Sequence, residues 1–174
     1  LLDTLDARKD VDGMTTASLG ALVTGAAGFA PCTAEACMEL LRAHGIDPAG
    51  RRVTVVGRSL VIGRPAALLL MRADATVTLC HRKTPDLAAR CRDADILLAA
   101  AGAPGLITTD FVRPGQIVLD AGATALPDGT LRGDVAPEAA AIAVCTPVPG
   151  GIGSVTTALL LRHTVQAAEN LRHF

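Results

Sequence analysis

The sequence is poor in aromatic residues, with no tryptophan, no tyrosine and three phenylalanines among its 174 residues. Proteins that bind single-stranded nucleic acids use aromatic rings to stack the bases, so this chain lacks most of that surface. It also lacks an excess of positive charge, because 16 Lys and Arg stand against 17 Asp and Glu. The two deficits together argue against a nucleic-acid partner.

The sequence also shows no pattern typical of a membrane span, a metal-binding motif or a secretory leader. Residues 139–161 carry no charge, but prolines and glycines at 147–153 interrupt any continuous helix, so no membrane partner is expected. The five cysteines are odd in number and lack C-x-x-C spacing, which favours reduced thiols in a cytoplasmic protein and no metal. The chain begins with Leu-Leu rather than Met, so we expect a piece of a longer protein.

What the sequence does contain is an alternation of short apolar runs and helical patterns. Hydrophobic residues make up 50% of the chain and charged residues 19%, a composition that supports a packed core and excludes disorder. Apolar runs typical of buried parallel strands occupy residues 52–57, 76–80, 95–100, 116–120 and 141–146. The sequence therefore predicts an α/β fold, Rossmann-like and doubly wound, with a mostly parallel sheet and helices on both faces.

Helices are expected between these strands and at both ends of the sheet region. Helical patterns occupy residues 63–72, 85–92 and 154–171, and Thr33 is the expected cap of a helix before the first strand. The segment Leu-Pro-Asp-Gly-Thr-Leu at 126–131 interrupts the alternation with a hairpin turn signal. It predicts a small antiparallel hairpin excursion from the sheet.

The junction after the first strand has the features of a phosphate-binding turn. Gly57 would let the chain turn off the strand, and Gly63 would allow close packing or a phosphate near the next helix. Pro65 fits the first turn of that helix, whose free N–H groups can bind an anion. The GxGxxG fingerprint is not met, because Ser59 and Ile62 stand where it needs glycine. The junction predicts either a nucleotide site or an ordinary strand–turn–helix connection.

The end of the second strand indicates which dinucleotide would bind. An NAD site usually has an acidic residue there for the ribose hydroxyl, whereas this chain has His-Arg-Lys-Thr at 81–84. Basic side chains suit the 2′-phosphate of NADP, and Arg58 could approach the same group from the first turn. The alternative is a solvated charged loop. We therefore expect NADP rather than NAD as the cofactor.

Five motifs occur together in one order. They are KDVDG at 9–13, PCT at 31–33, VVGRSLVIGRP at 55–65, TVTLCHRKT at 76–84 and TPVPGGIGSVT at 146–156. Through them, nearly the whole chain resembles the bifunctional methylenetetrahydrofolate dehydrogenase/methenyltetrahydrofolate cyclohydrolase family. The resemblance implies oxidation of 5,10-methylenetetrahydrofolate with NADP⁺, then hydrolysis to 10-formyltetrahydrofolate in one-carbon metabolism. It also implies a folate substrate and a homodimer that pairs through this domain.

Site residues are implied by the same resemblance. On the cofactor side they lie in the turns after the strands, and they are Gly57, Arg58, Ser59, Gly63, His81, Arg82, Gly122 and Ala123. On the substrate side they are Asp12, which would hold the pterin ring, and Pro149, Gly150 and Gly151, which would line the nicotinamide and folate cleft. Taken without the family, Asp12 is a turn residue and the glycine-rich loop is a tight connection into the last helix.

The family's catalytic lysine has no counterpart here. In relatives it lies in a Tyr-x-x-x-Lys helix of an amino-terminal domain, whereas this chain has no tyrosine and its lysines are Lys9 and Lys83. Neither lies in such a motif, so we assign no catalytic residue to this chain. His44 and His163 are expected at the surface or at helix ends.

Domain organisation and two alternative functions complete these expectations. The resemblance implies an interdomain connecting segment at 1–30, an NADP-binding domain at 31–160 and a helix at 161–174 that packs toward a missing domain. One alternative is a truncated NADP-binding or dimerisation module without turnover. The other is a different Rossmann dehydrogenase, acting for example on a shikimate or an amino acid, which leaves KDVDG and TPVPGG together unexplained.

Overall fold

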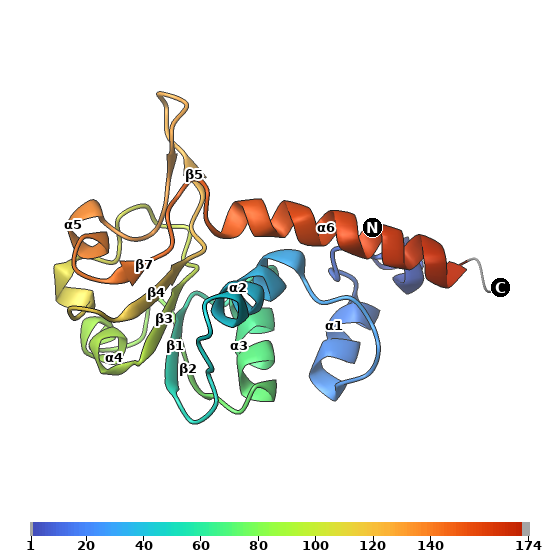
Figure 1. Ribbon diagram of the computed structural model, residues 1–174, viewed down its shortest axis with the longest axis horizontal. Helices are drawn as coiled ribbons and strands as arrows, with labels where there is room; N and C mark the ends of the chain where they lie inside the picture. The colour runs from blue at the N-terminus through green and yellow to red at the C-terminus, as the bar shows by residue number, and fades with distance from the viewer. Residues whose placement is uncertain (1, 172–174) are drawn as a thin grey trace.

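Five short strands form one parallel sheet in the computed structural model, which describes residues 2–171 (Figure 1). In the order β2-β1-β3-β4-β7, they are β2 (Thr76–Cys80), β1 (Arg52–Val56), β3 (Ile96–Ala99), β4 (Ile117–Asp120) and β7 (Val144–Cys145). All four pairings between neighbours are parallel. The doubly wound, mostly parallel α/β sheet is therefore confirmed, although the last strand is shorter than expected.

Helices cover both faces of the sheet and create two hydrophobic cores (Figure 1). Side chains alternate between faces along each strand. Val55 and Leu98 therefore face the core that also contains residues of α2 (Cys32–Ala43), α3 (Gly63–Arg72) and α6 (Ile152–Leu171). The alternate residues, such as Val56 and Leu97, pack with residues of the short helices α4 (Leu87–Asp93) and α5 (Pro137–Ala140). Burial on both sides explains why these strands are apolar almost throughout.

The starts of two helices differ from the sequence-based expectation. The helix α2 begins at Cys32 with Pro31 as its N-cap, so the prediction that Thr33 caps it is wrong. Its N-terminal N–H group at Cys32 is instead bonded by the side chain of Asp12, 3.2 Å away. The helix α6 begins at Ile152, two residues earlier than expected, and continues without a break, so the expected boundary between residues 160 and 161 falls inside it.

The segment before the sheet is folded, which the sequence patterns did not show. It contains two short 3₁₀ turns, η1 (Leu2–Thr4) and η2 (Ala7–Lys9), followed by the helix α1 (Thr16–Thr24). The buried carboxylate of Asp10 accepts hydrogen bonds from the Thr15 N–H at 2.7 Å and the Ser18 hydroxyl at 2.6 Å. In Figure 1 this segment lies beside the half of α6 that extends away from the sheet. Residues 1 and 172–174 of the expected terminal segments lie outside the described residues.

A two-stranded hairpin projects from the carboxyl side of the sheet (Figure 1). Its strands β5 (Thr124–Ala125) and β6 (Leu131–Arg132) are antiparallel, so the predicted hairpin excursion is confirmed. A third 3₁₀ turn, η3 (Thr109–Phe111), precedes β4. Within residues 2–171, no helix combines the length and the apolar character needed to cross a bilayer.

Candidate functional site

The turn from β1 into α3 lies where the sheet changes direction of winding. Strand β1 has β2 on one side and β3 on the other, and such a point forms a crevice at the carboxyl ends of the strands. Gly57 has a φ of +120°, and a Cβ there would collide with the carbonyl of Ala100, just after β3. A Cβ on Gly63 would collide in turn with the carbonyl of Gly57. Both glycines are therefore required by the close approach of backbone segments.

Ser59 lies inside this turn, three residues before Ile62, the N-cap of α3. Its hydroxyl oxygen accepts a hydrogen bond from the N–H of Ile62 at 3.1 Å and a longer one from Gly63 at 3.5 Å. These are N–H groups at the start of α3, the kind of position where helices bind anions. The Ser59 side chain thus occupies these two N–H groups, and it is itself exposed to a ligand.

Basic side chains follow the paired ends of β1 and β2. Val56 pairs with Cys80 in the sheet, and the N–H of Gly57 donates to the carbonyl of Cys80 at 2.9 Å. Arg58 and Arg82 each lie two residues beyond the Val56–Cys80 pair, so both emerge at the same edge. Both are exposed, and neither side chain has a hydrogen bond or an ion pair to any other residue between 2 and 171. Two guanidinium groups are therefore available to an anionic ligand.

His81 takes part in the turn after β2. Its Nδ1 lies 3.2 Å from the N–H of Lys83, which donates to it. The N–H of His81 in turn donates to the Thr84 hydroxyl at 2.9 Å. Because Nδ1 accepts a hydrogen bond, Nε2 is the nitrogen that remains for a ligand.

A cleft of about 460 Å³ lies next to this turn. Four of the expected residues line it, namely Ala123 after β4 and Pro149, Gly150 and Gly151 before α6. Residues that the sequence did not indicate also line it, including Thr33, Ile62 and Asp120. The four residues Arg58, Ser59, His81 and Arg82 do not line the cleft, but Ile62 at the start of α3 joins it to their turn.

Three glycines around the cleft are required for different structural reasons. Gly150 has a φ of +99° with open space around its α-carbon, so its backbone conformation requires glycine. A Cβ on Gly151 would collide with the carbonyl of Pro147, because the loop packs tightly against itself there. Gly122 is buried, and a Cβ there would collide with Asp134. Gly122 does not line the cleft, so its small size serves the packing behind it.

Two buried aspartates hold the loops at the carboxyl ends of β3 and β4. Asp120 accepts hydrogen bonds from the N–H groups of Gly122, Asp134 and Val135, at 3.0, 2.9 and 2.9 Å. Asp134 accepts from three successive N–H groups at 101–103, at 2.5 to 3.0 Å. Sequence reasoning missed this pair, although an acidic residue at the end of the apolar run QIVLD was a usable signal.

The charge of Asp120 is costly in this setting. Burial raises the pKa of its carboxyl, the hydrogen bonds from Val135, Asp134 and Gly122 lower it, and the nearby charge of Asp134 raises it further. The balance leaves the pKa above its usual value. The loops around the cleft are thus held by a carboxyl group whose burial costs solvation free energy.

Asp12 lies at the N-terminal end of α2, outside the cleft. One carboxylate oxygen accepts the N–H of Cys32, and the residue is exposed. Thr33, the next residue of α2, lines the cleft. The first turn of α2 therefore connects the predicted pterin contact with the cleft, although the two are far apart in sequence.

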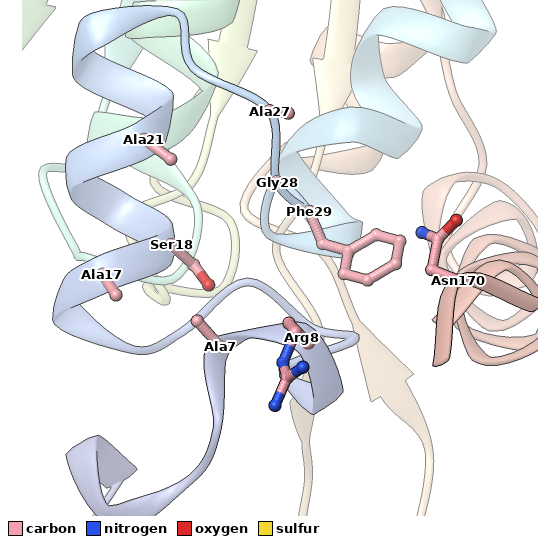
Figure 2. Close-up of a pocket in the computed structure, with 9 residues that line it drawn as sticks. All are labelled: Ala7, Arg8, Ala17, Ser18, Ala21, Ala27, Gly28, Phe29 and Asn170. Atoms are coloured by element: carbon pink, nitrogen blue, oxygen red, sulfur yellow. The ribbon is translucent and has the colours of Figure 1, made fainter. Parts of the chain in front are cut away.

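Figure 2 shows a second cavity, of about 370 Å³, beside the N-terminal segment. It is lined mainly by small side chains of α1 and of the loop before α2, with Phe29 and Asn170 at one side. Arg8, the charged residue among those labelled, is paired with Asp6 at 2.6 Å. This cavity has no cluster of reactive side chains that suggests chemistry.

Neither a metal centre nor a reactive thiol is present among residues 2–171. They contain no group of three or more His, Cys, Asp or Glu side chains arranged to hold a metal ion. All five cysteines are free thiols. Burial raises the pKa of Cys37 and Cys91 to about 12 and that of Cys145 to about 11, so these thiols stay protonated near neutral pH.

Comparison with known proteins identifies the family. The profile described as the tetrahydrofolate dehydrogenase/cyclohydrolase NAD(P)-binding domain matches residues 31–172. The chain belongs to this family. Membership excludes the reading as an unrelated Rossmann dehydrogenase.

Relatives of the family align along almost the whole chain. Bifunctional protein FolD 1 of Rhodococcus jostii is 56% identical over 172 residues, which are 97% of this chain and 57% of that protein. The crystal structure of the bifunctional FolD enzyme from Campylobacter jejuni has a TM-score of 0.92 and 42% identity, covering 97% of this chain and 61% of that one. The FolD of Trypanosoma brucei, solved with NADP and an inhibitor, has a TM-score of 0.91 and 38% identity over 99% and 62%. The chain thus spans about three-fifths of the length of these family members.

Replacement of Asp120 by asparagine tests whether its hydrogen bonds hold the loops together. We expect Asp120→Asn to lower the free energy of unfolding by about 1–3 kcal/mol, because an amide cannot accept all three backbone hydrogen bonds. The folded-state pKa of Asp120 is raised, so its contribution is greatest below the unfolded pKa and declines as pH rises through the folded value. Urea unfolding of both proteins from pH 3 to 7 measures this, and the stability difference between them should shrink with rising pH. A difference that grows with pH would contradict the assignment.

Proposed function

We propose that this chain binds NADP at the carboxyl ends of β1 and β2. The observation that carries the proposal is the pair of exposed, unpartnered guanidinium groups, Arg58 and Arg82, beside a turn that needs two glycines. A Cβ at Gly57 or Gly63 would collide with the backbone that each glycine contacts, so only glycine allows this tight turn beside the two arginines. The solved relative from Trypanosoma brucei was crystallised with NADP, which supports the same choice of cofactor.

Each residue group has a distinct task in this proposal. Arg58 and Arg82 bind the 2′-phosphate by charge-assisted hydrogen bonds, with His81 beside them. The exposed Ser59 hydroxyl, which also accepts the N–H of Ile62, binds the ribose or a phosphate. The backbone near Ala123 lies along the cofactor, with Gly122 packed behind it on Asp134.

We further propose that the cleft between β4 and α6 holds a folate next to the nicotinamide. Pro149, Gly150 and Gly151 line this cleft, and Asp12, in the loop before α1, holds the pterin ring from its place beside the first turn of α2. The activity is then the oxidation of 5,10-methylenetetrahydrofolate to 5,10-methenyltetrahydrofolate. In the full-length protein, hydrolysis to 10-formyltetrahydrofolate follows. The names of the Rhodococcus jostii and Campylobacter jejuni relatives, bifunctional FolD proteins, support the pairing of the two activities.

The oxidation step requires this chain mainly to position the two ligands. NADP⁺, when bound, supplies the acceptor for a hydride. No protein group has to donate a proton in that step, so the residues of this chain contribute by orienting two flat ligands face to face. The rigid proline- and glycine-rich loop before α6 and the aspartate-tied loops after β3 and β4 fit that task. Hydrolysis needs proton transfer, and no residue of this chain is assigned to it.

A truncated NADP-binding or dimerisation module without turnover remains the second candidate. The observation in its favour is that the chain has no tyrosine and that neither of its two lysines lies in a Tyr-x-x-x-Lys motif. Its length, about three-fifths of the relatives, is compatible with both candidates.

Cofactor choice is tested by removing the two arginines. Arg58→Ala and Arg82→Ala should each weaken NADP binding on the order of tenfold and NAD binding much less, because only NADP carries the 2′-phosphate. Isothermal titration with both dinucleotides measures the difference. Arg72→Ala is the matched control, since it removes the same charge at the far end of α3. Equal losses for both dinucleotides would show that the 2′-phosphate is held elsewhere.

The two candidates are separated by assaying the 174-residue chain beside the natural full-length protein. We expect it to bind NADP but to hydrolyse 5,10-methenyltetrahydrofolate at no more than the uncatalysed rate, because it lacks the lysine motif. The decay of methenyltetrahydrofolate absorbance measures this, with the natural full-length protein as the positive control. Turnover like that of full-length FolD proteins would refute the expectation, and an inactive full-length protein would favour the module.

A homodimer in the cytoplasm is the state we propose for the protein. Among residues 2–171, the edge strand β7 pairs on one side only and its Val144 is 60% exposed, a combination that suits further pairing. The five free thiols fit a reducing compartment. Light scattering during size-exclusion chromatography should give twice the mass of one chain, and a monomeric mass at micromolar concentration would contradict the dimer.

A further inference from the structure

A buried histidine connects α6 with the loop that carries Asp12. The side chain of His163 is 3% exposed, so the expectation of a surface or helix-end histidine is wrong. Its ring packs against Phe29 with 4.7 Å between the centroids. The Nδ1 atom lies 2.9 Å from the carbonyl oxygen of Val11, and Nε2 lies 3.1 Å from a carboxylate oxygen of Glu35. One side chain thus joins the loop before α1, the helix α2 and the helix α6.

The contact with Val11 assigns a proton to one ring nitrogen. A carbonyl oxygen only accepts hydrogen bonds, so Nδ1 of His163 is the donor. The thiol of Cys32 donates to the same oxygen at 3.4 Å. A carbonyl oxygen has two lone pairs, and here both are used by side chains of the two helices. The peptide between Val11 and Asp12 is therefore held from its carbonyl side.

The far side of the same short segment is held by backbone. One carboxylate oxygen of Asp12 accepts the N–H of Cys32 at 3.2 Å. At Gly13, a Cβ would collide with the carbonyl of Phe29, so the chain there is pressed against the segment before α2. Asp12 itself is exposed, and its position depends on these neighbours.

A nucleophilic role for this cluster is excluded by its environment. Cys32, His163 and Glu35 resemble the residue types of a Cys–His–acid triad. Burial, the hydrogen bond with Asp12 and the nearby charges of Asp12 and Glu35 raise the pKa of the Cys32 thiol to about 12. The residue is fully buried and its thiol donates to a carbonyl, so neither a thiolate nor a path for substrate is available.

We propose that His163 is a positioning residue for the Asp12 carboxylate, acting through the carbonyl of Val11. The proposal rests on the proposed function, in which Asp12 holds the pterin ring of the folate. The Nδ1–H group fixes the peptide that precedes Asp12, while the Glu35 contact keeps the ring in the orientation that makes this possible. Arg162 holds Glu35 from the other side at 2.5 Å. The orientation of the folate-binding aspartate is thereby set by α6, the helix that also begins at the cleft.

Two substitutions separate the donor atoms of His163. The amide nitrogen of asparagine reaches about the position of Nδ1, whereas that of glutamine reaches about the position of Nε2. His163→Asn should therefore keep the bond to Val11, and His163→Gln should lose it while keeping the contact with Glu35. In the natural full-length protein, we expect His163→Gln to raise the KM for 5,10-methylenetetrahydrofolate about three- to tenfold, with the KM for NADP⁺ unchanged. His163→Asn should stay within about twofold of the wild type.

A second variant changes the other donor to the Val11 carbonyl. Cys32→Ala removes the second donor to the same carbonyl and should raise the folate KM in the same direction, which keeps the test available if His163→Gln does not fold. Similar effects of the asparagine and glutamine variants, or a rise in the KM for NADP⁺ equal to that for folate, would overturn the proposal, because simple packing would produce both.

An amide NMR spectrum of the same proteins distinguishes failure of this inference from failure of the proposed function. The signals of Asp12 and Gly13 should shift in His163→Gln and stay in place in His163→Asn, whether or not a folate binds. If Asp12→Asn leaves the folate KM unchanged, the pterin contact is wrong, and the amide signals alone then decide whether His163 positions the loop. Unshifted signals in both variants would overturn the positioning role.

Discussion

The close approach of backbone segments at the ends of β1 and β3 is the constraint on which the site depends. Gly57 lies against the carbonyl of Ala100, and Gly63 lies against the carbonyl of Gly57, with no room for a Cβ at either glycine. This contact starts α3 at the carboxyl end of β1, where the N–H groups of Ile62 and Gly63 donate to the Ser59 hydroxyl. Any larger residue would push the helix away from the strand ends where the basic side chains emerge.

Buried polar groups then hold the loops around that crevice. Asp120 and Asp134 each accept three backbone N–H groups, so six donors in loops that have no regular partners are satisfied by two side chains. Left unpaired at this depth, each of these N–H groups would cost its full desolvation penalty. The cleft beside Ala123 is therefore shaped by residues that do not touch the proposed ligands. The same division appears at α2, where His163 and Cys32 hold the chain next to Asp12.

Much of this architecture could be predicted from local patterns. The first four strands were predicted within two residues of their observed ends, since burial on both faces makes them continuously apolar. The hairpin followed from its Pro-Asp-Gly turn. The folded N-terminal segment was not predicted, because α1 and the Asp10 network lack a strong apolar period. The cap of α2 was mistaken for Thr33, because the group that bonds its first N–H comes from Asp12 in a distant segment.

By itself, the sequence determined the first four strands, the glycine turn after β1 and the basic residues after β2, because each depends on neighbours a few positions apart. The tertiary structure decided which of these residues meet. Val11 and His163 are separated by 152 positions, and Asp120 and Asp134 by 14, yet each pair shares a hydrogen bond. Such contacts arise only once the helices have packed on the sheet, since packing alone brings a donor on one element to an acceptor on another and removes the water that both would otherwise bind.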